Sequence, residues 1–271
     1  MLILIKFVTV MEVYKEIVSL LEEMSPISLD DMSSIRLMKR TDTKFLTNLP
    51  TLLKLLKLAQ KNYFVQEVNG HRVANYATTY WDDALHHQFY RIHQCGHRPR
   101  TKVRVRSYSD SELAFLEVKK KNNHGKTSKK RIHVPSVDAV VNERYGEDFL
   151  QNLTGHTFDE IIPTLSNRFK RITLVNHGKT ERLTIDFDLS FLNRENGVEQ
   201  AMENIVIIEL KRDGRLPSPI MPILRELRIK PAGFSKYCVG LSVTDNTLRK
   251  NLFKERLVYI RKIAERNCLP H

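Results

Sequence analysis

Positively charged side chains recur at every second position in β-rich stretches of this sequence. In residues 101–108, TKVRVRSY, Lys102, Arg104 and Arg106 alternate with valine or serine. Because side chains along a strand point alternately to its two faces, this spacing puts all three cations on one face. Arginine holds phosphate oxygens in pairs through its planar fork, and many donors around one space suit several linked phosphates. The pattern therefore predicts a site for phosphate groups.

The same alternation returns in other stretches that have the composition of strands. The further rows are Arg40, Asp42 and Lys44; Glu117, Lys119 and Lys121; Lys129, Arg131 and His133; Arg168 and Lys170; Arg182, Thr184, Asp186 and Asp188; and Glu209 with Lys211. Like charges that face each other across strands are destabilising, and an anion held between the strands would offset this cost. We expect these rows to line the inside of a barrel. The alternative is an ordinary sheet with one face in water.

The composition agrees with an anionic partner. Lys and Arg number 44 against 31 Asp and Glu, which gives a formal net charge of +13. Nucleic acid, an anionic membrane and a phosphate-rich small molecule all fit such a charge. Three widely spaced cysteines without a CxxC pair predict a cytoplasmic protein, either free or peripheral to a membrane complex. No stretch approaches the ~20 apolar residues of a transmembrane segment.

The elements that must position these rows are strands with helices before, between and after them. Helical spacing predicts helices over 12–24, over 49–60 with Asn48 as N-cap, over 218–227, and over 246–265 with Asn246 or Thr247 as cap. The motif NHGKT occurs at 123–127 and at 176–180, between strand-like runs, and predicts two hairpin tips. A phosphate-binding P-loop is excluded because Lys120 and Thr173 stand where it needs glycine. Many antiparallel strands with short connections predict a closed or nearly closed barrel.

The motifs also resemble a known family when they are taken in order. The segments TTYWDD, TKVRVRSY, FLEVKKK, GKTSKKR, RLTIDFDL, IIELK and FSKY, between about Arg40 and Gly240, are similar to the VTC domain, the polyphosphate polymerase domain of the triphosphate tunnel metalloenzymes. The resemblance implies an α+β fold with a closed antiparallel eight-stranded β-barrel and flanking helices. We expect one domain, in which a helical segment (1–35) packs on the tunnel domain (36–245) and a basic helix (246–271) follows.

The resemblance also implies roles for single residues. Catalysis is expected from Arg104, Arg106, Lys119, Lys129, Arg168, Arg182 and Lys236. The same residues are expected to bind phosphate together with Lys44, Lys102, Arg131, Lys211 and Ser235. Glu209 matches the carboxylate that holds a divalent metal, Mg²⁺ or Mn²⁺, with Glu117 in reserve.

Some positions depart from the family pattern. The family often has tyrosine two places before the arginine that Arg168 matches, where this chain has Ser166. Trp81-Asp82-Asp83 replaces a phenylalanine–aspartate pair. The Glu-x-Glu-x-Lys strand of the related cyclase and thiamine-triphosphatase branch is absent, which favours the polymerase branch.

The implied activity is an ATP-dependent polyphosphate polymerase that transfers the γ-phosphoryl group of ATP to a growing chain. The partners are then ATP and polyphosphate or triphosphate, without a specific nucleic acid; protein partners stay undetermined. An acceptor that ends in phosphate is already anionic, so no general base is needed. The alternatives are a triphosphatase on the same fold and a non-catalytic binder of polyphosphate or nucleic acid.

Two other features carry weaker predictions. A zinc site at His93, Cys95 and His97 lacks an evident fourth ligand. The basic last helix fits a solvated face better than a binding surface.

Overall fold

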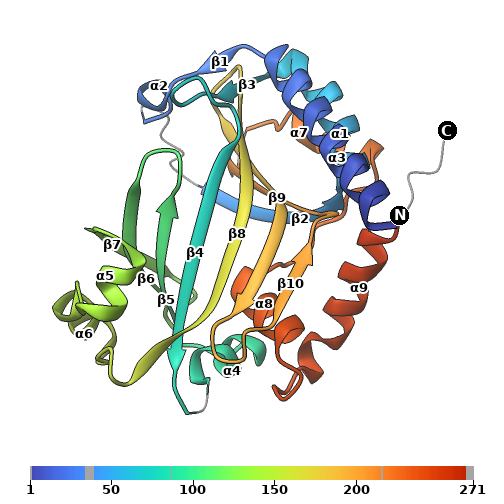
Figure 1. The fold of residues 1–271 in the computed structure, drawn as a ribbon. Helices are drawn as coiled ribbons and strands as arrows, with labels where there is room; N and C mark the ends of the chain where they lie inside the picture. Colours follow the sequence, from blue (N-terminus) through green and yellow to red (C-terminus); the bar gives the residue numbers. More distant parts are fainter. Residues whose placement is uncertain (1, 34–39, 86, 215, 267–271) are drawn as a thin grey trace.

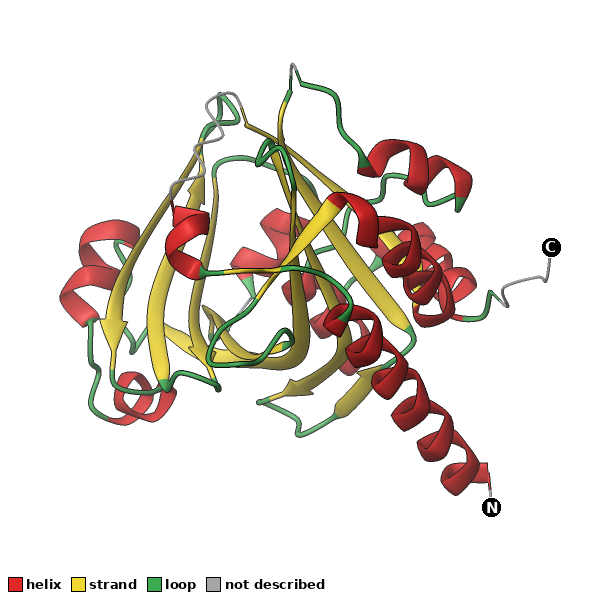
Figure 2. Ribbon diagram, turned by 90° about the horizontal axis from the view of Figure 1, so that it is seen from above, coloured by secondary structure: helices red, strands yellow, loops and turns green. Residues whose placement is uncertain are grey.

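A single, strongly curved β-sheet forms the centre of the computed structural model, which describes residues 2–33, 40–85, 87–214 and 216–266 (Figures 1 and 2). Its main path runs in the order β2-β11-β9-β8-β4-β5-β6-β7, and neighbouring strands on this path are antiparallel. These strands are β2 (Arg40–Asn48), β11 (Ile205–Asp213), β9 (Glu181–Asn193), β8 (Ile161–Asn176), β4 (Ala74–Asp83), β5 (Arg100–Tyr108), β6 (Leu113–Lys121) and β7 (Thr127–Val134). The short strands β1 (Pro26–Ile27), β3 (Tyr63–Gln66) and β10 (Glu199–Met202) extend the sheet at its rim.

The predicted closed barrel is wrong, because the sheet is open. Its main path has the expected eight strands, but in the described part of the chain β2 and β7 end that path and do not pair with each other. Strand β7 has little apolar surface to bury, and most of its residues are exposed, including Lys129 and Arg131. Closing the seam without a bound anion would bring these cations toward Lys44 of β2, at an electrostatic cost. The α+β class with flanking helices agrees with the structure. We call the concave face of the sheet the trough.

Helices cover most of the convex face of the sheet. Helices α1 (Leu2–Glu22), α3 (Leu49–Ala59) and α7 (Ile220–Glu226) pack on β2, β11, β9 and β8. Helices α5 (Val137–Asn142) and α6 (Glu147–Thr154) pack on β5, β6 and β7. The apolar rows of the strands lie in these contacts; Ile185 and Ile208 face the first group, and Val105 and Leu116 face the second. The outward packing of the apolar rows therefore leaves the charged rows on the concave side.

The predicted helix start at Asn48 is confirmed. The Asn48 side chain accepts a hydrogen bond from the Thr51 N–H (3.1 Å), as an N-cap does. Its amide also donates to the carbonyls of Ile263 (3.2 Å) and Arg266 (2.6 Å), which close helix α9 (Lys254–Ala264). One asparagine thus joins the end of β2 to the C-terminal helix.

Helix α9 is shorter than the predicted 246–265. The chain makes a turn first, because the Asp245 carboxylate accepts hydrogen bonds from both the N–H and the hydroxyl of Thr247 (2.7 Å each). A 3₁₀ turn (Asn251–Phe253) follows, and the α-helix begins only at Lys254. Among the described helices, which also include α2 (Leu29–Ser33), none is long and apolar enough to cross a membrane.

One end of the trough is filled by helix α8 (Lys236–Thr244), with α4 (Gln88–Gln94) beside it. Helix α8 lies directly on the sheet because it carries Gly240. A Cβ atom at this position would stand 2.5 Å from the Leu165 side chain and 2.6 Å from the Phe191 side chain. Beyond α8 the concave face carries the charged rows, with aromatic rings such as Phe169 among them. The trough is therefore closed at one end by the packed helix α8. We call the strands that carry the charged rows along the rest of the trough its charged walls.

Candidate active site

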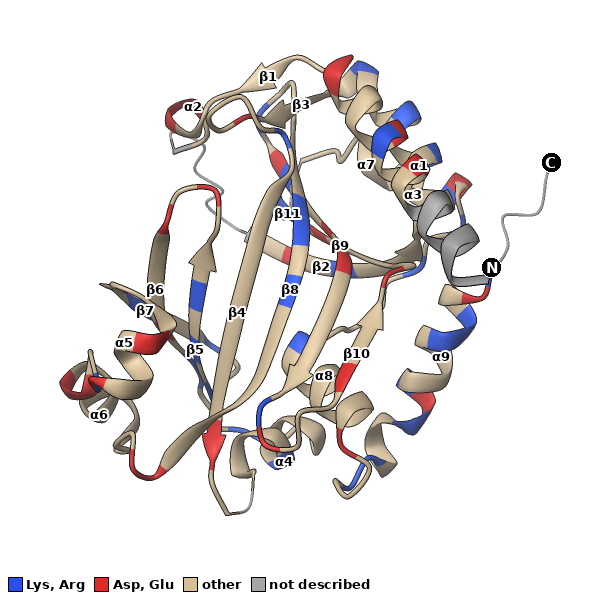
Figure 3. Cartoon of the chain, viewed as in Figure 1, with Lys and Arg blue, Asp and Glu red and all other residues tan. Residues whose placement is uncertain are grey.

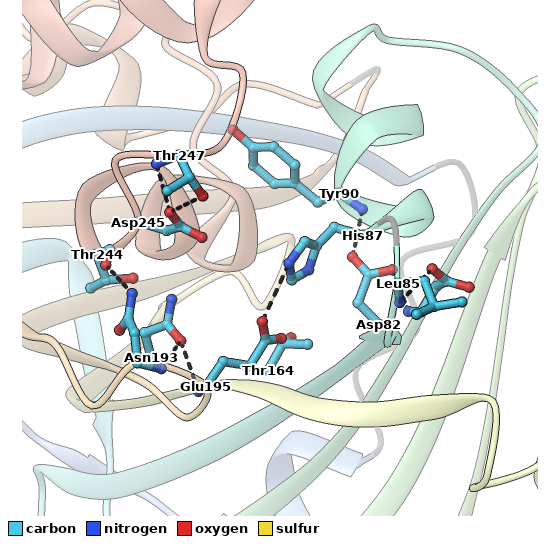
Figure 4. Close-up of polar contacts among 12 residues, drawn as sticks. Asp82, Leu85, His87, Tyr90, Thr164, Asn193, Glu195, Thr244, Asp245 and Thr247 are labelled. Atoms are coloured by element: carbon cyan, nitrogen blue, oxygen red, sulfur yellow. Dashed lines mark hydrogen bonds and ion pairs between the residues drawn. The ribbon is translucent and has the colours of Figure 1, made fainter.

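Asp82 anchors the first turn of α8 at the trough. This carboxylate is fully buried and accepts hydrogen bonds from the N–H groups of Phe89 and Tyr90 at the start of α4 (2.8 Å each). Figure 4 shows it pointing toward the Tyr90 nitrogen. The Tyr237 hydroxyl, from the FSKY motif, donates to the same carboxylate. Strand β4, α4 and α8 are thereby tied together, and the preceding residues Ser235 and Lys236 are held beside the charged walls.

The first charged group in the trough surrounds Asp186 on β9. Arg171 on β8 binds this carboxylate with both Nε (2.5 Å) and Nη2 (2.8 Å), and the ammonium group of Lys236 binds it too. Burial raises the pKa of Asp186, but the two cations outweigh burial and hold it well below its ordinary value. Burial also lowers the pKa of Lys236, to about 7. The Lys236 ammonium lies 3.8 Å from the centroid of the Phe169 ring.

The second group surrounds Glu117 on β6. Arg104 on β5 donates from Nε (2.7 Å), and Lys129 on β7 forms an ion pair with the other carboxylate oxygen. Glu117 is only 1% exposed. Burial raises its pKa, but Arg104, Arg106 and Lys129 together lower it to about 2. Two cations, from the strands on either side of β6, are therefore held at one point by one buried acid.

Two lysines lie between these groups, and each is fixed by the segment that leads into α8. Lys44 on β2 donates to the carbonyl of Phe234 (3.0 Å), and Lys102 on β5 donates to the Ser235 hydroxyl (2.9 Å). Burial lowers the pKa of Lys102 to about 8, and the nearby charge of Lys44 adds to the effect. Strands β2 and β5, on opposite sides of the trough, thus both place a lysine amino group at the start of α8. Figure 3 shows the basic positions along the strands.

Glu209 on β11 differs from the other two acids. It is half-buried, pairs across the ladder with Lys44 and Thr184, and makes neither a hydrogen bond nor an ion pair in the described part of the chain. Burial raises its pKa, but Lys44, Lys211 and Arg171 outweigh burial and lower it, so the side chain is anionic. An unpaired carboxylate within a basic surface has the chemistry of a cation ligand.

Glu209 fits Mg²⁺ or Mn²⁺ as a lone protein ligand. The described residues contain no group of three His, Cys, Asp or Glu side chains that could hold a metal. Magnesium commonly uses one or two carboxylates and completes its shell with phosphates and water. The reserve ligand, Glu117, is already bound by two cations. At the suggested zinc site, His93 Nδ1 lies 2.7 Å from the Phe89 carbonyl within α4.

The structure brings most of the predicted site residues to the trough. Strand register and contacts place there Lys44, Lys102, Arg104, Arg106, Lys119, Lys129, Arg131, Arg182, Lys211, Ser235 and Lys236, together with Glu209 and Glu117. These residues come from β2, β11, β9, β5, β6, β7 and the start of α8. Their alignment in rows is the arrangement that the alternating sequence predicts.

Arg168 is the exception, and its predicted place in the tunnel is corrected. It pairs with Ala77 and Ser190, is exposed, and lies in the same row as Ile172, which is buried under the helices of the convex face. The arginine of β8 that faces the trough is Arg171. Sequence reasoning missed it, although an aromatic residue, Phe169, stands two places before it and matches the family spacing better than Ser166 does before Arg168.

Comparison with known proteins gives one family. The model of the VTC domain matches residues 39–244. No curated protein matches the chain. Among solved structures, a candidate adenylate cyclase from Bacillus halodurans is similar, with 11% identity, coverage of 73% of this chain and 96% of that chain, and a TM-score of 0.48.

A candidate adenylyl cyclase from Hippeastrum, described as having a dominant triphosphatase activity, is also similar. Its identity is 14%, its coverage 79% of this chain and 99% of that chain, and its TM-score 0.45. The family therefore rests on the sequence model, which spans well over half of the chain. The protein belongs to the VTC domain family.

Proposed function

We propose that this protein is an ATP-dependent polyphosphate polymerase that works in the trough. The observation that carries the proposal is the contrast among three acids of the charged walls, Asp186, Glu117 and Glu209. Asp186 and Glu117 are each held by two cations, whereas Glu209 is unpaired beside Lys44. A basic surface with one uncommitted carboxylate is suited to polyphosphate chains that arrive with a divalent metal.

The side chains of the trough supply what phosphoryl transfer needs, which is positioning and neutralisation of charge. Arg104 and Arg106 on β5 can bind non-bridging oxygens of one chain, and Arg171 on β8 those of another. Lys102 and Lys236 add donors at the α8 end, where burial strengthens each interaction with an anion. A divalent cation bound at Glu209 would supply Lewis-acid polarisation of the phosphate oxygens.

The acceptor in this proposal is a phosphate group at the end of the chain. Because it is already anionic, it can attack without transferring a proton to the protein. The trough accordingly needs donors and not a base. Asp186 and Glu117 are both held anionic by their cations and serve as anchors for them.

A second candidate is a triphosphatase on the same trough. The open seam between β2 and β7 favours it, since an open sheet admits water to the bound phosphates. Water as acceptor would give free phosphate in place of a longer chain.

The product of the ATP reaction distinguishes these candidates. Purified protein with ATP and Mn²⁺ should form long polyphosphate, which is visible as a ladder on a gel. Free phosphate without chain growth would refute the polymerase and support the triphosphatase. If the protein does not turn over ATP with any added divalent metal, it is a non-catalytic protein that binds polyphosphate or nucleic acid. Glu209→Gln should then leave this binding unchanged.

A further inference from the structure

We propose that Asp186 is a positioning residue, whose carboxylate holds Arg171 and Lys236 side by side in the trough and keeps the Lys236 amino group charged for phosphate binding. The inference deepens the proposed function and rests on its phosphate-binding part. Asp186 belongs to the RLTIDFDL motif. Because its side chain is anionic, it does not bind phosphate directly.

The contacts of Asp186 leave no other role open for its oxygens. The residue is 4% exposed and lies in the middle of β9, opposite Arg171 of β8 and Ile207 of β11. Arg171 engages both oxygens, and Lys236 engages one of them. A buried carboxylate is stable only when it is paired and hydrogen-bonded in this way. Asp186 therefore acts through its two cations.

The two cations keep donors for a ligand. Arg171 uses Nε and Nη2 for Asp186, and its Nη1 has no partner among the described residues. Lys236 has one such bond of the three that an ammonium group can donate. The Phe169 ring lies under both, 3.8 Å from Lys236 Nζ and 5.3 Å from Arg171 Cζ, measured to the ring centroid. The pair is thus fixed in place before any phosphate arrives.

The charge of Lys236 depends on this carboxylate. Lys236 faces Asp186 of β9, Arg171 of β8 and Lys44 of β2. Burial, Arg171 and Lys44 lower the pKa of Lys236 and Asp186 raises it, and together they bring it to about 7. Without the Asp186 charge, the pKa of Lys236 would fall further. A smaller fraction of the amine would then be protonated at pH 6, and the rest would have to take up a proton when a polyanion binds.

The same strand offers a matched control in Asp188, two residues later. Asp188 has a positive φ of 53°, at a register shift between β8 and β9, and its side chain is 41% exposed. It pairs with Lys170 in the outward row that contains Ile172, away from the trough. Asn tolerates this backbone conformation, so Asp188→Asn removes a charge from the same strand without strain.

The test is the number of protons taken up when tripolyphosphate binds at pH 6, without metal. Calorimetry in two buffers of different ionisation enthalpy measures this number for the wild type, Asp186→Asn and Asp188→Asn. We expect Asp186→Asn to take up more protons than the wild type, because less of its Lys236 is protonated before the ligand binds. Asp188→Asn should match the wild type. Equal proton numbers for wild type and Asp186→Asn would overturn the inference. If the wild type does not bind tripolyphosphate at all, the proposed function fails instead.

A second measurement needs no substitution and covers the case in which Asp186→Asn does not fold. In the wild-type protein, the ¹³C resonance of the Asp186 carboxyl group should shift between pH 6 and 8, with the same midpoint as Lys236 Cε. A flat Asp186 resonance across the titration of Lys236 would overturn the inference, since the carboxylate would then not sense the lysine.

Discussion

Replacing Glu117 with glutamine should destabilise the protein strongly and in a pH-dependent manner. The substitution keeps the shape of the side chain but removes the charge that Arg104 and Lys129 share. The pKa of Glu117 falls from an ordinary 4.5 to about 2 in the fold, which corresponds to about 3 kcal/mol of stability at pH 7. Breaking a buried ion pair costs roughly 3–5 kcal/mol. The low end applies here, because Lys129 is 42% exposed.

The sign of the pH dependence follows from the direction of the pKa shift. A carboxyl group with a lowered pKa stabilises the fold fully above its unfolded pKa and loses this effect as the pH falls toward the folded value. The difference between wild type and Glu117→Gln should therefore be about 3 kcal/mol at pH 7 and shrink to about 2 kcal/mol at pH 3.5. Urea unfolding followed by circular dichroism at the two pH values measures both differences.

Glu16→Gln serves as the control for Glu117→Gln. Glu16 pairs with Lys57 at the surface, where both side chains are about half exposed, and such pairs are worth less than about 1 kcal/mol. A loss below about 1 kcal/mol for Glu117→Gln at pH 7, or the same loss at both pH values, would refute the reasoning. It would mean that the two cations find other partners, and that the acid does not hold them.

Four further outcomes are expected. Tripolyphosphate at ~100 times its Kd should add about 2.7 kcal/mol to the free energy of unfolding, measured by thermal melting; an unchanged Tm at saturation would exclude a specific site. Gly240→Ala should cost roughly 1–3 kcal/mol in urea unfolding, because its Cβ would overlap the Leu165 side chain, and wild-type stability would show that α8 can move away from the sheet. Glu209→Gln should lose metal-dependent turnover and still bind tripolyphosphate; turnover at the wild-type rate would remove Glu209 from the proposed site. Tripolyphosphate affinity should fall between pH 7 and 9, since Lys236 and Lys102, whose pKa values are about 7 and about 8, lose their charge there; equal Kd values would contradict this.

The alternating rows could be predicted from the sequence because strand geometry has a fixed period of two. Lys102, Arg104 and Arg106 share a face of β5 for this reason, and Glu117 and Lys119 share a face of β6. The helix cap at Asn48 was also visible, since its capping hydrogen bond comes from Thr51, three residues later. These features depend on local sequence alone.

The choice of row on β8 could not be predicted in the same way. Both of its faces carry arginine, with Arg168 in one row and Arg171 in the other, and alternation does not say which row faces inward. Helix α8 was missed for a related reason. Almost all of its residues are buried, so the sequence shows no polar stripe with helical spacing.

The prediction of a closed barrel rested on many antiparallel strands with short connections and on the family resemblance. Closure depends on whether two strands far apart in the sequence pair, which local patterns do not encode. Strands β2 and β7 are far apart in the sequence in this way. The positive charges on their inner faces oppose pairing of the two strands in the absence of an anion.

The free edge at β7 has a consequence for how the protein behaves at high concentration. An exposed edge strand is a template for another strand, and natural proteins protect such edges with charge. Strand β7 carries Lys129, Lys130 and Arg131 in succession, all exposed. These three cations discourage two molecules from pairing edge to edge. A long polyanion that binds to these residues from outside the trough would neutralise them and remove this protection. We therefore expect the protein to aggregate more readily when such a polyanion covers β7.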